Sequence, residues 1–330
     1  MSELHKFLFD GLPVRGAIVR LTDAWTELLS RRASNSETGA YPPPVAELLG
    51  EMAAAGVLMQ SHIKFNGALV LQVFGDGPVK LAVAEVRSSL ALRATATISG
   101  EVPDGARLPD LVNAGGQGRC AITLDPQDRL PGQQPYQGVV PLNDAQGDKL
   151  GSLAETITQY MRQSEQLDAT LVLAANDQVA AGLLIQRMPV QGEGNLAGGA
   201  GRADDDEQRA QQDEDYRRIA TLAASLTREE LLSLDVPTIL HRLFWEERLL
   251  RFEPRQGADG PRFACTCSRE RVSAMLRSLG AEEVQSILHE RGDVEVGCDF
   301  CGRQYHFDKV DATQLFTEPG KQPPASSGVQ

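Results

Sequence analysis

The stretch Cys265-Thr266-Cys267, followed thirty residues later by Cys298-Asp299-Phe300-Cys301-Gly302, contains four of the five cysteines in this chain of 330 residues. Two close pairs joined by a loop can bring four sulfur atoms to one point, which is the tetrahedral arrangement of closed structural zinc sites. We therefore expect one zinc ion per chain, with the ligands Cys265, Cys267, Cys298 and Cys301. Gly302 suits the turn after the second pair, because a residue without Cβ adopts positive φ easily.

Two roles for such a site remain open at this point. In the first, the metal only stabilises a small C-terminal lobe, as structural zinc usually does. In the second, the site is also a redox sensor, because the thiolate is the form of cysteine that oxidants attack. Zinc binding contributes about 10–16 kcal/mol of folding free energy in small peptides, so its loss can unfold a lobe of this kind. The first pair has one spacer residue, where zinc ribbons have two or more.

Length and charge restrict the class of protein. A chain of this length predicts two or three domains, and its net charge of −13 disfavours binding to nucleic acid or to an anionic membrane. Residues 1–10 lack the apolar segment of a signal peptide, and no later run reaches the roughly 18 apolar residues of a membrane span. We expect a cytosolic protein, where cysteines are kept reduced and paired cysteines indicate metal binding or redox chemistry.

The remaining candidate residues are predicted to be structural. Cys120 lies in the apolar run Cys120–Leu124 and should be a buried core residue. His306 is the one plausible substitute ligand, but four sulfurs already complete a zinc site. The sequence contains no recognisable catalytic triad, phosphate loop or paired-carboxylate motif, so we do not expect an enzyme.

The N-terminal part alternates in the manner of strands, with a few separate helical segments. Strand-like runs cover residues 14–21, 63–74, 79–86, 90–98, 119–124, 137–142, 169–175 and 179–188. Helical patterns follow Thr22-Asp23, Tyr41-Pro42-Pro43-Pro44 and Ser152. This order predicts an α+β fold, with an N-terminal sheet packed by helices.

A different composition begins near residue 190. Gln191–Gly201 is rich in Gly and Ala, and Asp204–Glu207 is an acidic run, so we expect disorder in both. Helical patterns resume with Tyr216, Ile219 and Leu222. Thr227-Arg228-Glu229-Glu230 is a capping box, and Asp235 with Pro237 begins a further helix. The apolar faces of these helices should dock on the N-terminal sheet.

The C-terminal lobe has the pattern of a small metal-dependent module. Ser268 is a candidate N-cap for a helix that Gly280 can end, and a second helix is predicted over Glu282–Glu290. Val294–Val296 and Gln304–Phe307 are predicted to form a hairpin around Cys298 and Cys301. The few apolar residues in this lobe predict a thin core that needs the metal.

With these motifs identified, the chain resembles the heat shock protein 33 family of redox-regulated holdase chaperones, also called 33 kDa chaperonins. The similar segments are Val14–Gly16, Ile63–Phe65, Gln163–Leu167, Gly182–Gln186, Ile239–Phe244 and, above all, Phe263–Arg271 with Cys298–Cys301. The stretch from Gly192 to Asp215 looks longer than the corresponding entry to the linker in the family.

The resemblance implies a domain organisation and a mechanism. Its expected parts are an N-terminal core and dimerisation domain (1–189), a flexible acidic insert and helical linker (190–255), a zinc-binding redox-switch domain (256–318) and a disordered tail (319–330). The reduced zinc-bound form would be inactive. Oxidation would form the disulfides Cys265–Cys267 and Cys298–Cys301, release zinc and unfold the linker.

The resemblance also implies the partners. The oxidised protein would be a homodimer that binds unfolded proteins without ATP and prevents their aggregation during oxidative stress. Once undocked, the apolar stripe of the linker would be available to clients. Its candidate residues are Ile219, Leu222, Leu226, Leu231 and Leu232.

Two other functions compete with this one. A zinc-ribbon protein with purely structural zinc, acting in nucleic-acid or protein binding, would need basic and aromatic residues on one face. Residues 256–330 carry 8 Lys and Arg against 11 Asp and Glu, a net charge of −3, which disfavours nucleic acid. A thiol–disulfide oxidoreductase using Cys298 and Cys301 would place that pair at a helix N-terminus, whereas here Gly302 and a strand are predicted to follow.

Overall fold

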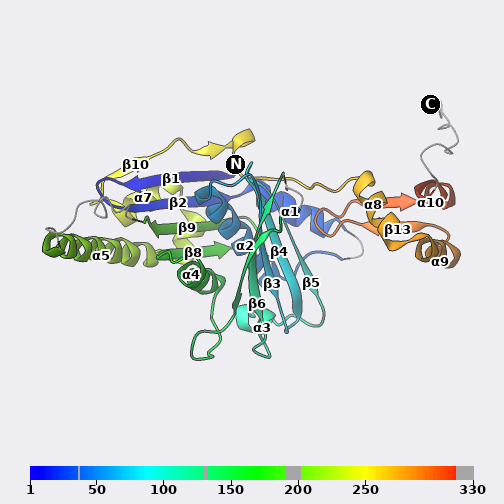
Figure 1. Ribbon diagram of the computed structural model, residues 1–330, viewed down its shortest axis with the longest axis horizontal. Helices are drawn as coiled ribbons and strands as arrows, with labels where there is room; N and C mark the ends of the chain where they lie inside the picture. Colours follow the sequence, from blue (N-terminus) through cyan, green and yellow to red (C-terminus); the bar gives the residue numbers. More distant parts are fainter. Residues whose placement is uncertain (36–37, 129–131, 190–201, 317–330) are drawn as a thin grey trace. The chain divides into compact units, whose positions relative to one another are not determined.

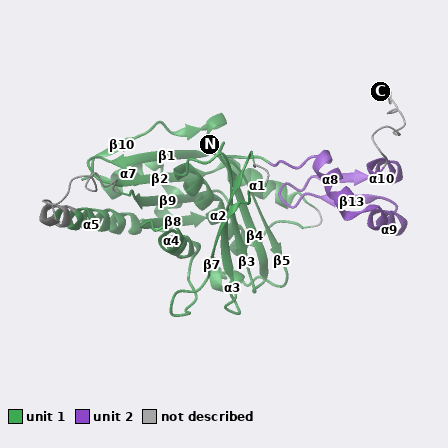
Figure 2. Ribbon diagram, viewed as in Figure 1, with its two compact units in different colours: residues 1–264 green, residues 265–330 purple. Residues whose placement is uncertain are grey.

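The computed structural model describes residues 1–35, 38–128, 132–189 and 202–316 (Figure 1). The chain divides into two compact units, residues 1–264 and residues 265–330 (Figure 2). Within the described residues, no helix is both long enough and apolar enough to cross a membrane.

The first sheet of unit 1 has the strand order β10-β1-β2-β9-β8, and β11 also pairs with β1. All of these pairs are antiparallel. The strands are β1 (Glu3–Phe9), β2 (Val14–Leu21), β8 (Ala169–Ala175), β9 (Ala180–Arg187), β10 (Leu249–Arg251) and β11 (Arg255–Gln256). A 3-10 turn, η2 (Gly257–Asp259), follows β11.

The second sheet of unit 1 has the order β12-β5-β4-β3-β6-β7. Its strands are β3 (Gly67–Phe74), β4 (Val79–Arg87), β5 (Ala91–Ile98), β6 (Arg119–Pro126), β7 (Tyr136–Pro141) and β12 (Arg262–Phe263). Only β12, which comes from the end of the unit, runs parallel to its neighbour β5. It adds a late segment of the chain to a sheet whose other strands lie between residues 67 and 141.

Helix α2 (Pro43–His62) lies in the main core together with residues of both sheets (Figure 1). It begins at a proline, whose fixed φ suits the first helical turn, and most of its middle residues are buried. Small residues on α2 allow the helix to lie close to the strands. A Cβ added at Gly50 would lie 2.5 Å from the Cβ of Ala175, and one at Gly56 would lie 2.8 Å from a methyl carbon of Val86. The two glycines therefore let α2 pack closely against a strand of each sheet.

Three further helices complete the layer around α2: α1 (Asp23–Ala33), α3 (Leu108–Val112) and α4 (Leu153–Ser164). Trp25 of α1 is fully buried, and its indole N–H donates a hydrogen bond of 2.7 Å to the backbone oxygen of Asn176. Ser152 is the N-cap of α4 as predicted, since its side chain accepts a hydrogen bond from the Glu155 N–H.

The opposite face of the first sheet is covered by α5 (Arg202–Ala224), α6 (Arg228–Ser233) and α7 (Val236–Phe244) (Figure 1). The predicted capping box of Thr227 and Glu230 and the predicted N-cap Asp235 are both confirmed. The disorder expected for Asp204–Glu207 is wrong, because the backbone of this run lies in α5. The run is flanked by Ala, Gln, Arg and Glu, which favour helix and let it extend the docked segment. Gln191–Gly201 and the tail 319–330 lie outside the described residues.

Unit 2 is a small α+β module. Its elements are α8 (Arg269–Leu279), α9 (Ala281–Arg291), the hairpin of β13 (Val294–Gly297) and β14 (Gln304–Phe307), and α10 (Lys309–Leu315). Ser268 caps α8, and Gly280, with φ of +101°, ends it, as predicted. Within its described residues, 265–316, the core consists of six buried hydrophobic residues: Leu276, Val284, Val294, Tyr305, Phe307 and Ala312. The core is as thin as the sequence predicted.

The α+β fold class is confirmed. Strands β2 and β8 occupy the predicted residues, and most other strands of unit 1 begin and end within two residues of the prediction. The strand predicted from Ile63 begins later, at Gly67, because α2 continues to His62 and the chain must turn before it enters β3. The N-terminal strands also divide between two sheets, and one of these sheets is covered by helices on both faces.

Candidate metal centre and docked linker helices

The four cysteines of the two close pairs meet in unit 2. Cys265 and Cys267 precede α8, whereas Cys298 and Cys301 occupy the turn between β13 and β14. Their four Sγ atoms all lie within 4.8 Å of one another. Two of the separations join one pair to the other: 3.6 Å from Cys265 to Cys298 and 3.3 Å from Cys267 to Cys301.

The hairpin turn explains why the second pair is close together. The Cys298 N–H donates to the backbone oxygen of Arg303 at 3.0 Å, and the Gly302 N–H donates back to the Cys298 oxygen at 2.8 Å. Gly302 has φ of +68°, in the left-handed region that favours glycine. The tight turn closes the end of the hairpin and directs both thiols to the same place.

The donor set fits a zinc ion. A tetrahedron of thiolates about 2.3 Å from zinc places its sulfur atoms about 3.8 Å apart. The observed separations of 3.3 and 3.6 Å, with every pair inside 4.8 Å, are close to that spacing. Four sulfur donors favour soft ions over magnesium or calcium. The cluster can therefore hold a metal ion of this kind.

The thiols do not share one environment. Burial raises the pKa of Cys265, but the backbone N–H of Cys267 and the neighbouring thiols lower it more, to about 7. Burial raises the pKa of Cys298 and of Cys301. The cluster therefore contains one thiol that ionises readily near neutral pH beside two that resist ionisation, and a bound cation would favour the thiolate form of all of them.

The other residues considered from the sequence lie elsewhere. Cys120 is fully buried on β6, where burial raises the pKa of its thiol to about 12, so its prediction as a core residue is confirmed. His306 is not in the cysteine cluster. Its Nδ1 lies 3.0 Å from a carboxylate oxygen of Glu295, and with Asp293 these side chains form a separate group of possible ligands that the sequence analysis did not single out.

The predicted apolar stripe of the linker is docked on the first sheet. Ile219, Leu226 and Leu231 are buried, and Leu222 and Leu232 are half-buried at the edge of the same cluster. Their partners on the sheet include Phe7 and Phe9 of β1 and Ile18 of β2. In this state, the candidate client-binding residues are covered by the sheet.

Polar contacts fasten these helices as well. The Arg20 guanidinium on β2 donates to the backbone oxygens of Leu231, Leu232 and Leu234 at 3.2, 2.9 and 3.1 Å. These are orphan carbonyls at the C-terminal end of α6, which otherwise lack partners within the helix. One basic side chain of the sheet therefore caps a linker helix.

The aromatic residues of β1 that contact α7 were not predicted from the sequence. Phe7, Phe9 and Phe244 form a three-ring cluster with centroids 5.1 to 6.2 Å apart. The alternation of Leu4, Lys6 and Leu8 with His5, Phe7 and Phe9 fits a strand, and this signal could have located β1. The strand pattern is hard to recognise, because the residues on each of the two faces include both apolar and basic side chains.

The protein has an α+β core with an apolar helical segment docked on one of its sheets, and a four-cysteine module follows in the chain. These features define a class of protein with a candidate thiolate metal centre. The family model described as Hsp33 protein matches residues 2–308. The chain belongs to the Hsp33 family of chaperones.

The relatives cover nearly the whole chain. The 33 kDa chaperonin of Chromobacterium violaceum is 45% identical over 315 residues, covering 96% of this chain and 94% of the relative. That of Methylobacillus flagellatus is 43% identical over 319 residues, with the same shares. The crystal structure of the 33 kDa chaperonin of Thermotoga maritima has a TM-score of 0.71 at 22% identity, covering 95% of this chain and 97% of that chain. This last likeness supports the fold.

Proposed function

We propose that this chaperone is an ATP-independent holdase that oxidation switches on, and that it is not an enzyme. The observation that carries the proposal is the pairing of an oxidisable four-cysteine cluster in unit 2 with an apolar linker stripe that is covered in unit 1. In the reduced protein the stripe is not available to clients. If oxidation of the cysteine cluster exposes this stripe, the oxidant causes the protein to bind unfolded proteins.

Cys265, Cys267, Cys298 and Cys301 are the proposed zinc ligands, with one ion per reduced chain. When bound, zinc would hold these sulfurs as thiolates and contribute folding free energy to a unit whose own core is thin. Cys298 and Cys301 are the first proposed disulfide. Their two sulfurs, held as thiolates, lose two electrons to hydrogen peroxide, which takes up two protons from the solvent and is reduced to two molecules of water, and an S–S bond forms.

The second proposed disulfide joins Cys265 and Cys267. After both have formed, no thiolate remains at the cluster, and six buried hydrophobic residues are left to hold unit 2 together. A core of that size is marginal without further cross-links. We therefore expect unit 2 to unfold on full oxidation.

Release of the linker requires a further step in unit 1. Between α7 and Cys265 the chain pairs with the two sheets through β10, β11 and β12, which have three, two and two residues. Strands this short are held by few hydrogen bonds. We propose that they detach when unit 2 unfolds, after which α5–α7 leave the sheet and expose Ile219, Leu222, Leu226, Leu231 and Leu232 to clients in the cytoplasm.

The charge of the chain suits a holdase. A net charge of −13 keeps a complex with an unfolded client soluble even while apolar surface is exposed. We further propose that the oxidised protein is a homodimer through residues 1–189. Sedimentation of oxidised full-length protein tests the dimer, and a strictly monomeric species at high micromolar concentration would contradict it.

Aggregation of a chemically unfolded enzyme provides the functional test. We expect peroxide-treated protein to suppress light scattering and reduced protein not to. Cys120→Ser is the matched control and should behave as the wild type, whereas Cys298→Ser should lose the dependence on peroxide. Equal suppression by reduced and oxidised wild type would contradict a redox switch.

Hydrogen exchange locates the change. On full oxidation, protection should be lost from roughly residues 213–310 and retained in 1–189, because only the linker and unit 2 depend on the cysteine cluster. A linker that stays protected after both disulfides have formed would show that another surface binds clients.

A further inference from the structure

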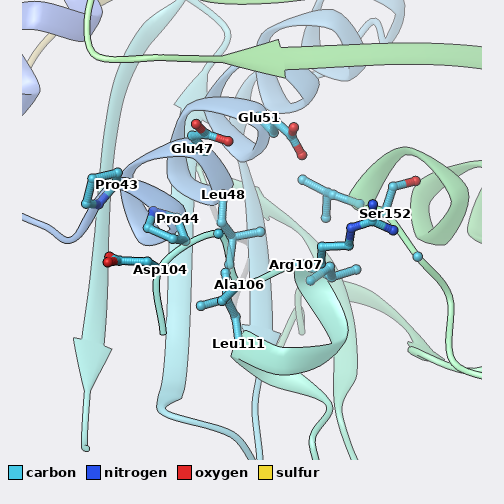
Figure 3. Close-up of a pocket in the computed structure, with 14 residues that line it drawn as sticks. Pro43, Pro44, Glu47, Leu48, Glu51, Asp104, Ala106, Arg107, Leu111 and Ser152 are labelled. Carbon is cyan, nitrogen blue, oxygen red and sulfur yellow. The ribbon is translucent and has the colours of Figure 1, made fainter. Parts of the chain in front are cut away.

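A cavity of about 400 Å³ opens in unit 1, between the N-terminal end of α2, the chain before α3 and the start of α4 (Figure 3). Its volume lies within the range of roughly 300–1,000 Å³ that is usual for small-molecule sites. Leu48, Leu111 and Leu153 contribute apolar lining. Charged and polar side chains also line it, and their arrangement indicates what it binds.

Two carboxylates from α2 line one side of the cavity. Glu47 and Glu51 are four residues apart on the helix, so they lie on the same face. Glu47 is already paired, since its Oε1 lies 3.0 Å from Nη2 of Arg228, which also donates to the backbone oxygen of Ala175. Arg228, the first residue of α6, therefore neutralises Glu47 through an ion pair, and Glu51 is left to bind another partner.

Glu51 lacks such a partner. Among the residues that the structure describes, none donates a hydrogen bond to its carboxylate or forms an ion pair with it. Burial and the charge of Glu47 raise its pKa, which Arg228 only partly opposes, and the resulting value is about 7. A carboxylate without a donor inside a cavity is costly, and an ammonium group would relieve that cost by charge and by hydrogen bonds.

A different wall of the cavity is suited to an anion. Figure 3 shows Arg107 beside Ser152, away from Glu47 and Glu51. Within the described chain, no carboxylate is ion-paired with the Arg107 guanidinium. Ser152 is the N-cap of the twelve-residue helix α4, and its hydroxyl hydrogen remains free to donate while its oxygen accepts from the Glu155 N–H. A carboxylate here would meet the Arg107 guanidinium and the Ser152 hydroxyl, beside the Glu155 carboxylate, which already accepts from the Gly151 N–H at 2.8 Å.

We propose that this cavity binds a small zwitterion of the amino-acid class, with its ammonium group at Glu51 and its carboxylate at Arg107 and Ser152. Opposite charges on two walls favour a ligand with opposite charges at its two ends. A diamine would leave one cation facing Arg107, and a dicarboxylate would leave one anion facing Glu51. The leucine side chains of the lining suit a short methylene chain.

Calorimetric titration of reduced, zinc-loaded full-length protein with ω-amino acids of increasing length tests the proposal. The probes are 3-aminopropanoate, 4-aminobutanoate and 6-aminohexanoate, with 1-aminobutane and butanoate as ligands that carry a single charge. We expect saturable binding of at least one zwitterion, at least tenfold tighter than that of either single-charge ligand. Equal affinity for 1-aminobutane would show a cation site instead, and absence of saturable binding at millimolar concentration would overturn the site.

Single substitutions test the proposed ammonium site and the proposed carboxylate site independently. Glu51→Gln and Arg107→Gln should each weaken zwitterion binding at least tenfold, while Glu101→Gln, an exposed position outside the cavity lining, should not. Circular dichroism of each variant establishes that it is folded. If the wild type binds and Glu51→Gln binds equally well, the proposed position of the ammonium group is wrong.

The pH dependence supplies an independent readout. The charged groups around Glu51 are Glu47 on α2, Arg228 on α6 and Asp104 and Arg107 before α3, with Glu155 on α4. Glu51 becomes ionised as pH rises through about 7, so affinity for the zwitterion should increase from pH 6 to pH 8. The same titration of Glu51→Gln should be flat. Binding that weakens over this range would contradict the assignment, whatever the outcome of the chaperone assays.

Discussion

The ring of Phe244 in α7 packs edge-on against the ring of Phe9 in β1, with 5.1 Å between the ring centroids and 88° between the ring planes. Both side chains are almost fully buried. Edge-to-face pairs of this kind contribute about 0.5–1.5 kcal/mol beyond the free energy of area burial. The last linker helix is thus held by the first strand of the chain, and this contact is a place to test linker docking.

We predict that Phe244→Ala loosens the linker in the reduced protein. Truncation of a buried Phe costs about 3–5 kcal/mol, and here that loss falls on docking of α7. Hydrogen exchange should become faster in α5–α7 and stay unchanged in β3–β6. Trp245→Ala is the matched control, because the Trp245 side chain is 69% exposed. Unchanged protection in Phe244→Ala would show that the linker is held by other contacts.

Arg20 provides a second test of docking, through the backbone. Arg20→Ala removes the donor to three carbonyl oxygens of α6 and should lower the free energy of linker docking by about 1–3 kcal/mol. Exchange of the α6 amides measures this loss. Arg248→Ala serves as the control, since its ion pair with Asp10 at 3.2 Å is on the surface. Equal effects of the two substitutions would argue against a capping role.

Metal content distinguishes the four clustered cysteines from the fifth. Reduced wild type and Cys120→Ser should each hold one zinc ion per chain, because Cys120 is buried on β6 outside the cluster. Cys298→Ser removes one of four donors and should severely weaken zinc binding. Elemental analysis after purification under reducing conditions gives the stoichiometry. Loss of zinc from Cys120→Ser would contradict the ligand assignment.

Peptide mapping of partly oxidised protein tests the order of disulfide formation. We expect Cys298–Cys301 to form first and Cys265–Cys267 second. A disulfide across one intervening residue is strained, so the second should also be the more easily reduced. Short sulfur separations of 3.6 and 3.3 Å also join Cys265 to Cys298 and Cys267 to Cys301. Recovery of either of these cross-linked peptides as the main product would therefore disprove the proposed pairing.

Glu51 should make stability depend on pH. Its pKa is about 7 in the folded protein and about 4.3 in an unfolded chain, so the folded state binds more protons between these values. The free energy of unfolding should therefore fall as pH rises from about 4.3 to 7. Glu51→Gln should remove this fall and stabilise the protein by about 1–3 kcal/mol at pH 8. Urea denaturation at pH 5 and pH 8 measures it, and a variant less stable than wild type at pH 8 would contradict the expected sign.

Local signals in the sequence were enough to locate many elements. The residues of β2 and β8, the caps Ser152, Thr227 and Asp235, and the ends of α8 follow from alternation and from side chains that bond to nearby backbone groups. These interactions join residues a few positions apart, so a single sequence displays them. The acidic run in α5 was misjudged because composition alone does not reveal that a neighbouring docked helix can extend through it.

The sequence by itself determined the four-cysteine candidate centre, since two close pairs of cysteines separated by a short stretch of chain can bring four sulfur atoms to one point. Only the tertiary structure decided which sheet each strand joins, that α2 lies between the sheets, and that Phe9 receives Phe244. It also decided that Glu51 and Arg107 share a cavity. The physical reason is that pairing and burial between distant segments depend on how whole faces fit together, and a periodic pattern records only that a face is apolar, without recording its partner.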